Sequence, residues 1–239
     1  MRADPVRIEG RSFLLTLLAF AASGSSFSQT GWGGLWLGGV HTFYARSSSV
    51  SVNQPALDIA YGARFSSDLS RGFRFMLDLG VYKRHLETDL FLPYTGSVLL
   101  TTTRTDLKSI ALGIGGAVTL FDGNAWETRV LFGAVISAPY SVSIDVSTPY
   151  GTGSRYTDAK HQGPGVSLKL GGRYAYSIGD GLWLFVEGVA WIALKDEYEW
   201  VPSHGPGIDP IVPKSIGGIT CTLGFEFGPK AAKYQQPQD

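Results

Sequence analysis

Two neighbouring segments of the chain, 57–65 and 73–84, alternate strictly between two kinds of side chain. One face of the first segment is apolar, and the other carries small and charged residues. The link 66–72 consists of turn-forming residues. Because successive side chains of a β-strand point to opposite faces, this pattern predicts a β-hairpin with one apolar face. Charges and glycines share the second face, which is typical of a strand between lipid and a polar lumen.

The same alternation recurs along the chain and predicts eight strands, over 31–44, 57–65, 73–84, 109–120, 126–146, 166–178, 182–194 and 218–227. Both faces of the first strand are fairly apolar, so its phase stays open. In the fifth strand the outward phase continues through Tyr140, Val142, Ile144 and Val146, so we expect this strand to project beyond a membrane. Three short turns alternate with four long connections, 46–55, 86–106, 149–165 and 195–214.

This layout predicts an all-β fold, an eight-stranded antiparallel up-and-down transmembrane β-barrel. We expect a signal peptide over 1–28, the barrel over 31–228 and a short periplasmic tail over 229–239. Both chain ends and the short turns would face the periplasm, with the long connections outside the cell.

The N-terminus has a basic start with Arg2, Arg7 and Arg11, followed by an apolar run of about ten residues, 13–22, and then small residues. This is the composition of a secretory signal peptide, with cleavage after Ser28. The alternative is an uncleaved membrane anchor. The apolar run falls short of the roughly twenty residues that a spanning helix needs, which favours cleavage.

Composition narrows the function classes. The 239 residues carry a formal net charge of zero and only 17% charged residues, without a basic stripe, so we expect no nucleic-acid partner. Cys221 is the only cysteine, which excludes an intramolecular disulfide framework and a cysteine-based zinc site. We expect no cofactor and no bound metal.

Charged residues of the predicted strands share the face that carries the glycines, which gives a balanced set of five acids and five bases in the lumen. A soluble eight-stranded barrel would have the opposite polarity, apolar inside and charged outside. We expect paired charges that plug the lumen, because eight strands leave little open width; a gated ion path is the alternative. The predicted lumen charges are Asp58, Arg64, Arg74, Asp78, Glu127, Arg129, Lys169, Arg173, Glu187 and Glu226.

Aromatic residues on the outward faces gather near the short-turn ends of their strands. Aromatic side chains favour the headgroup boundary, so we expect an interfacial girdle, although aromatics are also common in strands generally. The predicted girdle consists of Phe65, Phe73, Trp126, Tyr174, Tyr176, Phe225 and Phe227. Aromatics in the long connections, such as Tyr94 and Trp200, could form a recognition surface or an upper girdle.

A catalytic site is not expected. A hydrolase would need serine, histidine and a carboxylate within hydrogen-bond reach. Every histidine (His41, His85, His161 and His204) falls near the long-connection end, and the only local pairings are His85 with Glu87 and Ser203 with His204. Ordinary polar loop residues explain these pairs equally well.

The signal sequence, the eight alternating strands and the terminal run Gly224-Phe225-Glu226-Phe227 resemble the small outer-membrane β-barrels of Gram-negative-type bacteria, the OmpA, OmpX and OmpW-like barrels. The resemblance covers the mature chain and is one of architecture, without a diagnostic motif. It implies a place in the cell outer membrane, contact with its lipid and lipopolysaccharide, and insertion by the barrel-assembly machinery. A tail follows Phe227, whereas such barrels usually end on the aromatic residue.

Three functions follow as hypotheses. The first is a structural or surface-interaction protein that uses four long extracellular loops, with an extracellular ligand as partner. The second is a narrow channel or uptake barrel for small or hydrophobic solutes. The third is an outer-membrane lipid-modifying enzyme. Fold analogy alone does not choose among them.

Overall fold

The computed structural model describes residues 31–45, 51–55, 57–70, 72–91, 99–149, 153–156, 164–179, 181–196 and 214–228. The predicted signal peptide and tail lie outside these residues. The described strands are β1 (Gly31–Tyr44), β2 (Ser51–Pro55), β3 (Asp58–Ser70), β4 (Phe73–Phe91), β5 (Leu99–Asp122), β6 (Trp126–Ser147), β7 (Gly153–Tyr156), β8 (Gly165–Gly179), β9 (Leu182–Lys195) and β10 (Ser215–Phe227). No helix in the described part of the chain is long and apolar enough to cross a membrane.

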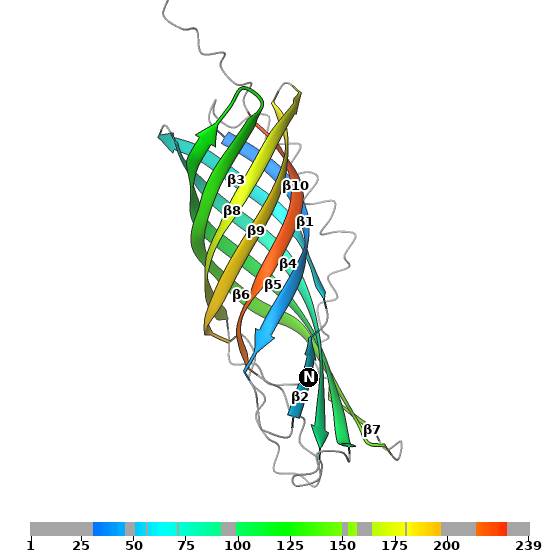
Figure 1. The fold of residues 1–239 in the computed structure, drawn as a ribbon. Helices are drawn as coiled ribbons and strands as arrows, with labels where there is room; N and C mark the ends of the chain where they lie inside the picture. The colour runs from blue at the N-terminus through cyan, green and yellow to red at the C-terminus, as the bar shows by residue number, and fades with distance from the viewer. Residues whose placement is uncertain are drawn as a thin grey trace, which may run out of the picture.

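Eight of the strands form a closed antiparallel ring, in the order β1, β3, β4, β5, β6, β8, β9 and β10 (Figure 1). The pairing of β1 with β10, from Gly33 opposite Phe227 to Tyr44 opposite Ser215, closes it. Gly72 and Gly181, with φ of 84° and 80°, lie in two of the short turns, where the backbone needs a left-handed conformation. The predicted eight-stranded barrel is confirmed.

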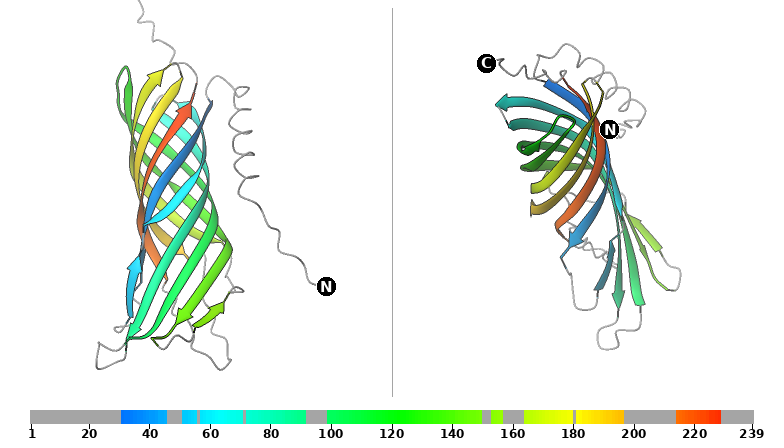
Figure 2. Two further views of the ribbon diagram at one scale, coloured as in Figure 1. Left: turned by 90° about the vertical axis from the view of Figure 1, so that its right-hand side faces the viewer. Right: turned by 45° about the horizontal axis from the view of Figure 1, so that its top comes forward.

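Three neighbouring strands, β4, β5 and β6, continue well past the others at the long-loop end (Figure 2). The β4–β5 pairing runs on to Phe91 opposite Leu99, β2 pairs with β4, and β7 pairs with β6. We call this five-stranded sheet, built from β2, 83–91, 99–108, 141–147 and β7, the extension. The prediction of a long loop over 86–106 was therefore wrong for 86–91 and 99–106. Likewise, β2 and β7 occupy parts of the connections predicted over 46–55 and 149–165.

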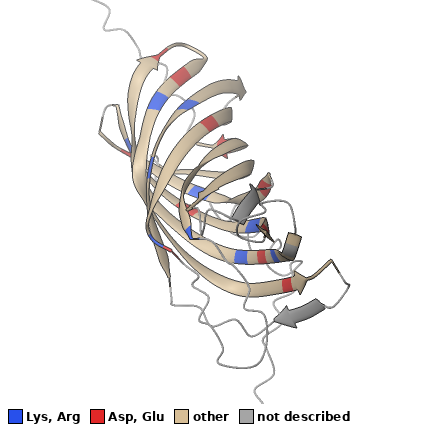
Figure 3. Ribbon diagram, turned by 60° about the horizontal axis from the view of Figure 1, so that its bottom comes forward, with Lys and Arg blue, Asp and Glu red and all other residues tan. Residues whose placement is uncertain are grey.

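The outward face changes character where the extension begins. Within the barrel each strand directs exposed aliphatic or aromatic side chains outward, for example Leu37, Ile59, Leu77, Leu112, Phe132, Leu168, Val186 and Leu223. On β4 and β5 this band ends at Lys83 and Lys108, which lie opposite each other. Beyond them the outward row is polar, and Figure 3 marks the charged positions as seen from this end. The polar outward row explains why an alternation rule based on lipid contact missed these residues.

A β-bulge in β6 overturns a second expectation. Lys108 lies opposite Ser141 and Ser109 lies opposite Pro139, so Tyr140 is an extra residue on β6. An extra residue exchanges the two faces of the strand, and proline, which lacks an N–H, is tolerated at such a site. Val142, Ile144 and Val146 therefore follow the inward phase, and the last two are buried. The predicted continuous outward phase through these residues was wrong.

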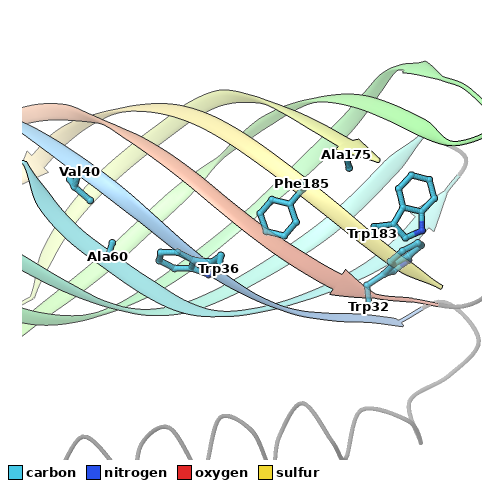
Figure 4. Close-up of a cluster of buried hydrophobic side chains, with 7 residues drawn as sticks. All are labelled: Trp32, Trp36, Val40, Ala60, Ala175, Trp183 and Phe185. Carbon is cyan, nitrogen blue, oxygen red and sulfur yellow. The ribbon is translucent and has the colours of Figure 1, made fainter. Parts of the chain in front are cut away.

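Inward-facing side chains fill much of the barrel. In β1, whose phase stayed open, Trp32, Trp36 and Val40 are buried and belong to a cluster with Phe185 and Trp183 (Figure 4). Glycines on neighbouring strands make room for the rings: a Cβ at Gly62 would lie 2.7 Å from Trp36, and one at Gly224 would lie 2.4 Å from Phe185. The glycines on the lumen face thus let large rings pack closely against the wall.

Candidate functional site

The middle of the lumen holds a chain of ion pairs between strands that are far apart in sequence. The guanidinium of Arg173 on β8 donates to both carboxylate oxygens of Glu226 on β10, each at 2.7 Å. Arg64 on β3 donates to Asp78 at 2.6 Å and to both oxygens of Glu187 on β9. Asp78 also accepts from Nζ of Lys169 at 2.7 Å. These bonds cross the lumen as well as following its wall.

Toward the short-turn end, Arg74 joins three acids. Its Nε donates to Asp68 at 2.8 Å, and its Nη1 lies 3.4 Å from Glu226 and 3.8 Å from Glu127. Arg129 donates to Glu127 at 2.8 Å. One connected set results, which we call the lumen network: Arg64, Asp68, Arg74, Asp78, Glu127, Arg129, Lys169, Arg173, Glu187 and Glu226.

All of the predicted lumen charges except Asp58 belong to this network, and Asp68 takes the place of Asp58. Asp68 was assigned to a turn, yet it continues the inward phase of Arg64 and Ser66 and lies opposite Arg74. That phase is the signal that could have found it. Asp58 instead lies at the long-loop end, where it accepts the backbone N–H of His85 at 2.6 Å. The network keeps five acids and five bases.

Burial makes this pairing obligatory. The side chains of Glu226 and Arg173 have relative exposures of 0% and 1%, and removal of such charges from water costs several kcal/mol per ion. Bidentate bonds between guanidinium and carboxylate are among the strongest that a protein offers. The Arg173 guanidinium also lies 4.4 Å from the centre of the Phe185 ring. Together these contacts form a polar plug across the lumen.

A cavity of about 100 Å³ lies between this plug and the long-loop end. Its floor is formed by network residues, among them Arg64, Asp78 and Lys169. Its wall includes the rings of Trp36, Tyr82 and Trp191, and Lys195, Asp196 and Ser215 line it at the strand ends. Sequence reasoning did not find this cavity, because no pattern along one strand shows which inward side chains leave space between them.

The predicted girdle residues lie on the outward faces. Trp126 and Tyr174, on neighbouring strands, stack with ring centres 6.4 Å apart, and Phe225 and Phe227 meet edge to face at 5.5 Å. Phe73 packs near Phe132 at 6.2 Å. The membrane depth of these rings stays a prediction.

Solved structures with a similar fold include outer-membrane proteins. A major outer membrane protein from Thermus thermophilus matches with a TM-score of 0.50 at 11% identity, covering 84% of this chain and 99% of its own. This chain has the fold of an outer-membrane β-barrel. Neisserial surface protein A (TM-score 0.47, 14% identity, 82% of this chain and 96% of its own) is also similar. The outer membrane protein OprG from Pseudomonas aeruginosa is similar as well, with a TM-score of 0.46 at 9% identity, covering 83% of this chain and 95% of its own.

At these low identities the similarities bear on the fold alone. Neither a protein-family model nor a curated protein matches the sequence. The role of the barrel must therefore be argued from its own side chains.

One row of the extension resembles a catalytic set in composition but not in order. His85 on β4 lies opposite Asp106 on β5, 2.7 Å from its carboxylate, and Asp106 lies opposite Ser143 on β6. A hydrolase needs the histidine between the serine and the acid. Here the acid is in the middle, so the ring and the hydroxyl stand two strand spacings apart, roughly 10 Å.

Among the described residues, the other histidine does not complete such a set. His41 faces outward on β1 beside Phe43, with ring centres 5.3 Å apart. His161 and His204 lie outside the described residues. Within the described ranges no group of three or more His, Cys, Asp or Glu could hold a metal ion.

Proposed function

We propose that this outer-membrane barrel is a non-conducting surface protein that holds the extension out from the membrane for contact with other surfaces. The long-loop end faces outward in this proposal. The observation that carries it is the unbroken β4–β5 ladder, which continues from the barrel to Leu90 opposite Thr101. A sheet that grows directly out of a closed barrel shares the rigidity of the barrel wall.

The extension is built like a soluble sheet. Outward, Glu87 accepts from Arg104 at 2.9 Å and Asp89 accepts from Thr102 at 2.6 Å, both between directly opposing positions of β4 and β5. Inward, Leu86, Leu107 and Ile144 are buried. The buried row also contains Thr88, Thr103 and Thr105. A polar outward face over a buried face of aliphatic and threonine side chains supports a part that works in water, with its outward side chains available to a partner.

The lumen network supports the non-conducting half of the proposal. Movement of an ion through the plug would require several buried pairs to separate, among them Arg173 with Glu226 and Arg64 with Glu187. Each separation leaves a buried charge without its partner. The alternative of a narrow channel would require a second arrangement of these same side chains.

Two measurements test the two parts of this proposal, the non-conducting lumen and the surface contact. Refolded protein in a planar bilayer should give no stable conductance steps, once heat-modifiable gel migration has shown that the barrel is formed. Resolvable steps that change when Glu187 is replaced by Gln would favour the channel instead.

To test the surface contact, bacteria that display the wild-type chain are compared with bacteria that display a shortened variant. In the variant, Asn-Gly replaces residues 89–102, so that Thr88 and Thr103 stay opposite each other. Adherence to epithelial monolayers, adherence to polystyrene and self-sedimentation are measured. We expect the wild-type chain to raise at least one of the three, and the shortened variant to lose that gain. Equal behaviour of both strains and of cells without the protein in all three assays would contradict the proposal.

A further inference from the structure

We infer that the cavity above the plug is a binding site for a small organic anion that carries a ring, of about the size of benzoate. The volume of about 100 Å³ would hold roughly seven to ten waters at ten to fifteen Å³ each. Ligand binding at this site would occur whether or not the extension contacts another surface.

The wall of the cavity fits a ring. Trp36, Tyr82 and Trp191 line it, with Val40, Val135 and Val189 between them. The Trp36 and Tyr82 ring centres are 6.2 Å apart at 57°. Aromatic and aliphatic walls with a few fixed polar groups are the usual composition of a small-molecule site.

Hydrogen-bond donors in the wall lack acceptors. Trp36 is 7% exposed and Ser109 is fully buried, yet Nε1 of the indole and Oγ of the serine have no hydrogen-bond partner among the described residues. Indole nitrogen can only donate, and a buried donor without an acceptor costs about 1 to 3 kcal/mol. An acceptor group on a ligand, such as a carboxylate oxygen, would remove that cost.

The charge of the lining favours an anion. Four basic and three acidic side chains line the cavity, which leaves one positive charge in excess: Arg64, Arg84, Lys169 and Lys195 against Asp78, Glu187 and Asp196. Lys169 at the floor uses one of its three ammonium protons on Asp78. Its remaining protons can bond a carboxylate without breaking the network.

The test is calorimetric titration of refolded, full-length protein in detergent micelles with sodium benzoate, benzyl alcohol and benzylamine. These probes share a ring and differ in charge. We expect saturable one-to-one binding of benzoate, at least about tenfold tighter than benzyl alcohol or benzylamine. Absence of saturable benzoate binding would overturn the inference, and so would benzylamine binding as tightly as benzoate.

Two neighbouring substitutions locate the site. Val135 lines the cavity, whereas Ala134 belongs to the outward phase of β6. Val135→Trp should fill the cavity and weaken benzoate binding at least tenfold, and Ala134→Trp should leave it within twofold. Trp36→Phe, which keeps a ring but removes the indole N–H, should weaken binding about three- to tenfold. Benzoate binding that survives Val135→Trp unchanged would place the ligand elsewhere, whatever the adherence assays show.

Discussion

The barrel and the extension share three strands, β4, β5 and β6, yet their polarity is inverted. In the barrel, Leu77 and Leu112 face outward while Asp78 and Lys169 are paired inside. In the extension, Arg104 and Asp106 face outward and Leu107 is buried. The alternation itself does not stop at Lys83 and Lys108. What changes is the surrounding solvent, lipid for one part and water for the other.

The three shared strands reach this inversion in two different ways. Along β4 and β5 the inward and outward positions continue in the same alternation, but the outward positions change from apolar to polar residues. Along β6 the apolar residues continue at every second position, but the bulge at Tyr140 turns them from the outward to the inward face. A period of two in the sequence therefore identifies a strand, but it does not say which face meets lipid.

The largest difference in stability is expected between the loss of a buried ion pair in the barrel and the loss of an exposed ion pair in the extension. Arg173→Met leaves Glu226 buried with only the longer contact to Arg74, so we expect a loss of about 3 to 5 kcal/mol in the free energy of unfolding. Arg104→Met removes a pair whose arginine side chain is 60% exposed, and should cost less than about 1 kcal/mol. Urea unfolding in lipid vesicles measures both.

The double variant Arg173→Met with Glu226→Gln supplies the control. It removes the buried unpaired charge, and the amide oxygen can still accept from Arg74. We expect it to recover most of the loss. A double variant as unstable as Arg173→Met alone would mean that packing, and not charge, holds this part of the lumen.

An arginine placed on the outward face should destabilise the barrel more than the extension. Ala134 and Ser141 both face outward on β6, on opposite sides of the bulge. Ala134→Arg places a guanidinium in the apolar band and should cost about 2 to 4 kcal/mol, whereas Ser141→Arg should change stability by less than about 0.5 kcal/mol. Unfolding in vesicles is again the measurement. Equal effects would mean that the band does not lie in hydrocarbon.

Most of the barrel could be predicted from the sequence, because lipid on one side and a crowded polar lumen on the other impose the same alternation on all eight strands. Residues near the ends of the predicted strands could not. Asp68 looked like a turn residue because it follows two serines, and Ile144 looked outward because a bulge leaves no mark in hydropathy. The cavity depends on how Trp36, Tyr82 and Trp191 from three strands leave space, which no single strand encodes.

Deletion of Tyr140 tests the bulge. Without the extra residue, Ile144 and Val146 would turn outward and lose their burial, while the ring pairings of β6 with β8, which end at Ser137, would remain. We expect the extension to open more readily by at least about 1.5 kcal/mol, the value for one buried aliphatic side chain. Amide exchange over 141–147 should accelerate about tenfold or more.

Tyr140→Ser keeps the residue count and is the matched control for that deletion. It should leave exchange over 141–147 nearly unchanged, and both proteins should keep the heat-modifiable gel migration of a closed barrel. Slow exchange in the deletion variant would show that the register of β6 can shift without loss of the extension.

A pH-dependent effect is expected where the two regions meet. Asp58 begins β3 at the long-loop end, beyond the level of Lys83, and burial raises the pKa of its carboxyl to about 6, against the opposing influence of the His85 N–H and the Arg84 charge. The native state therefore holds this proton more tightly than the unfolded state, whose carboxyl titrates near 3.8. Stability contributed by the protonated form is lost as the pH rises through this window.

Asp58→Asn removes the titration but keeps an oxygen that can accept the His85 N–H. The stability of the wild-type barrel relative to this variant should fall between about pH 4 and pH 7 and then stay constant. A shift from 3.8 to about 6 corresponds to a change of up to about 3 kcal/mol across this window. Urea midpoints of both proteins at four or five pH values measure it. A relative stability that rises with pH would mean that Arg84 outweighs burial, and that the boundary belongs electrostatically to the paired interior of the barrel.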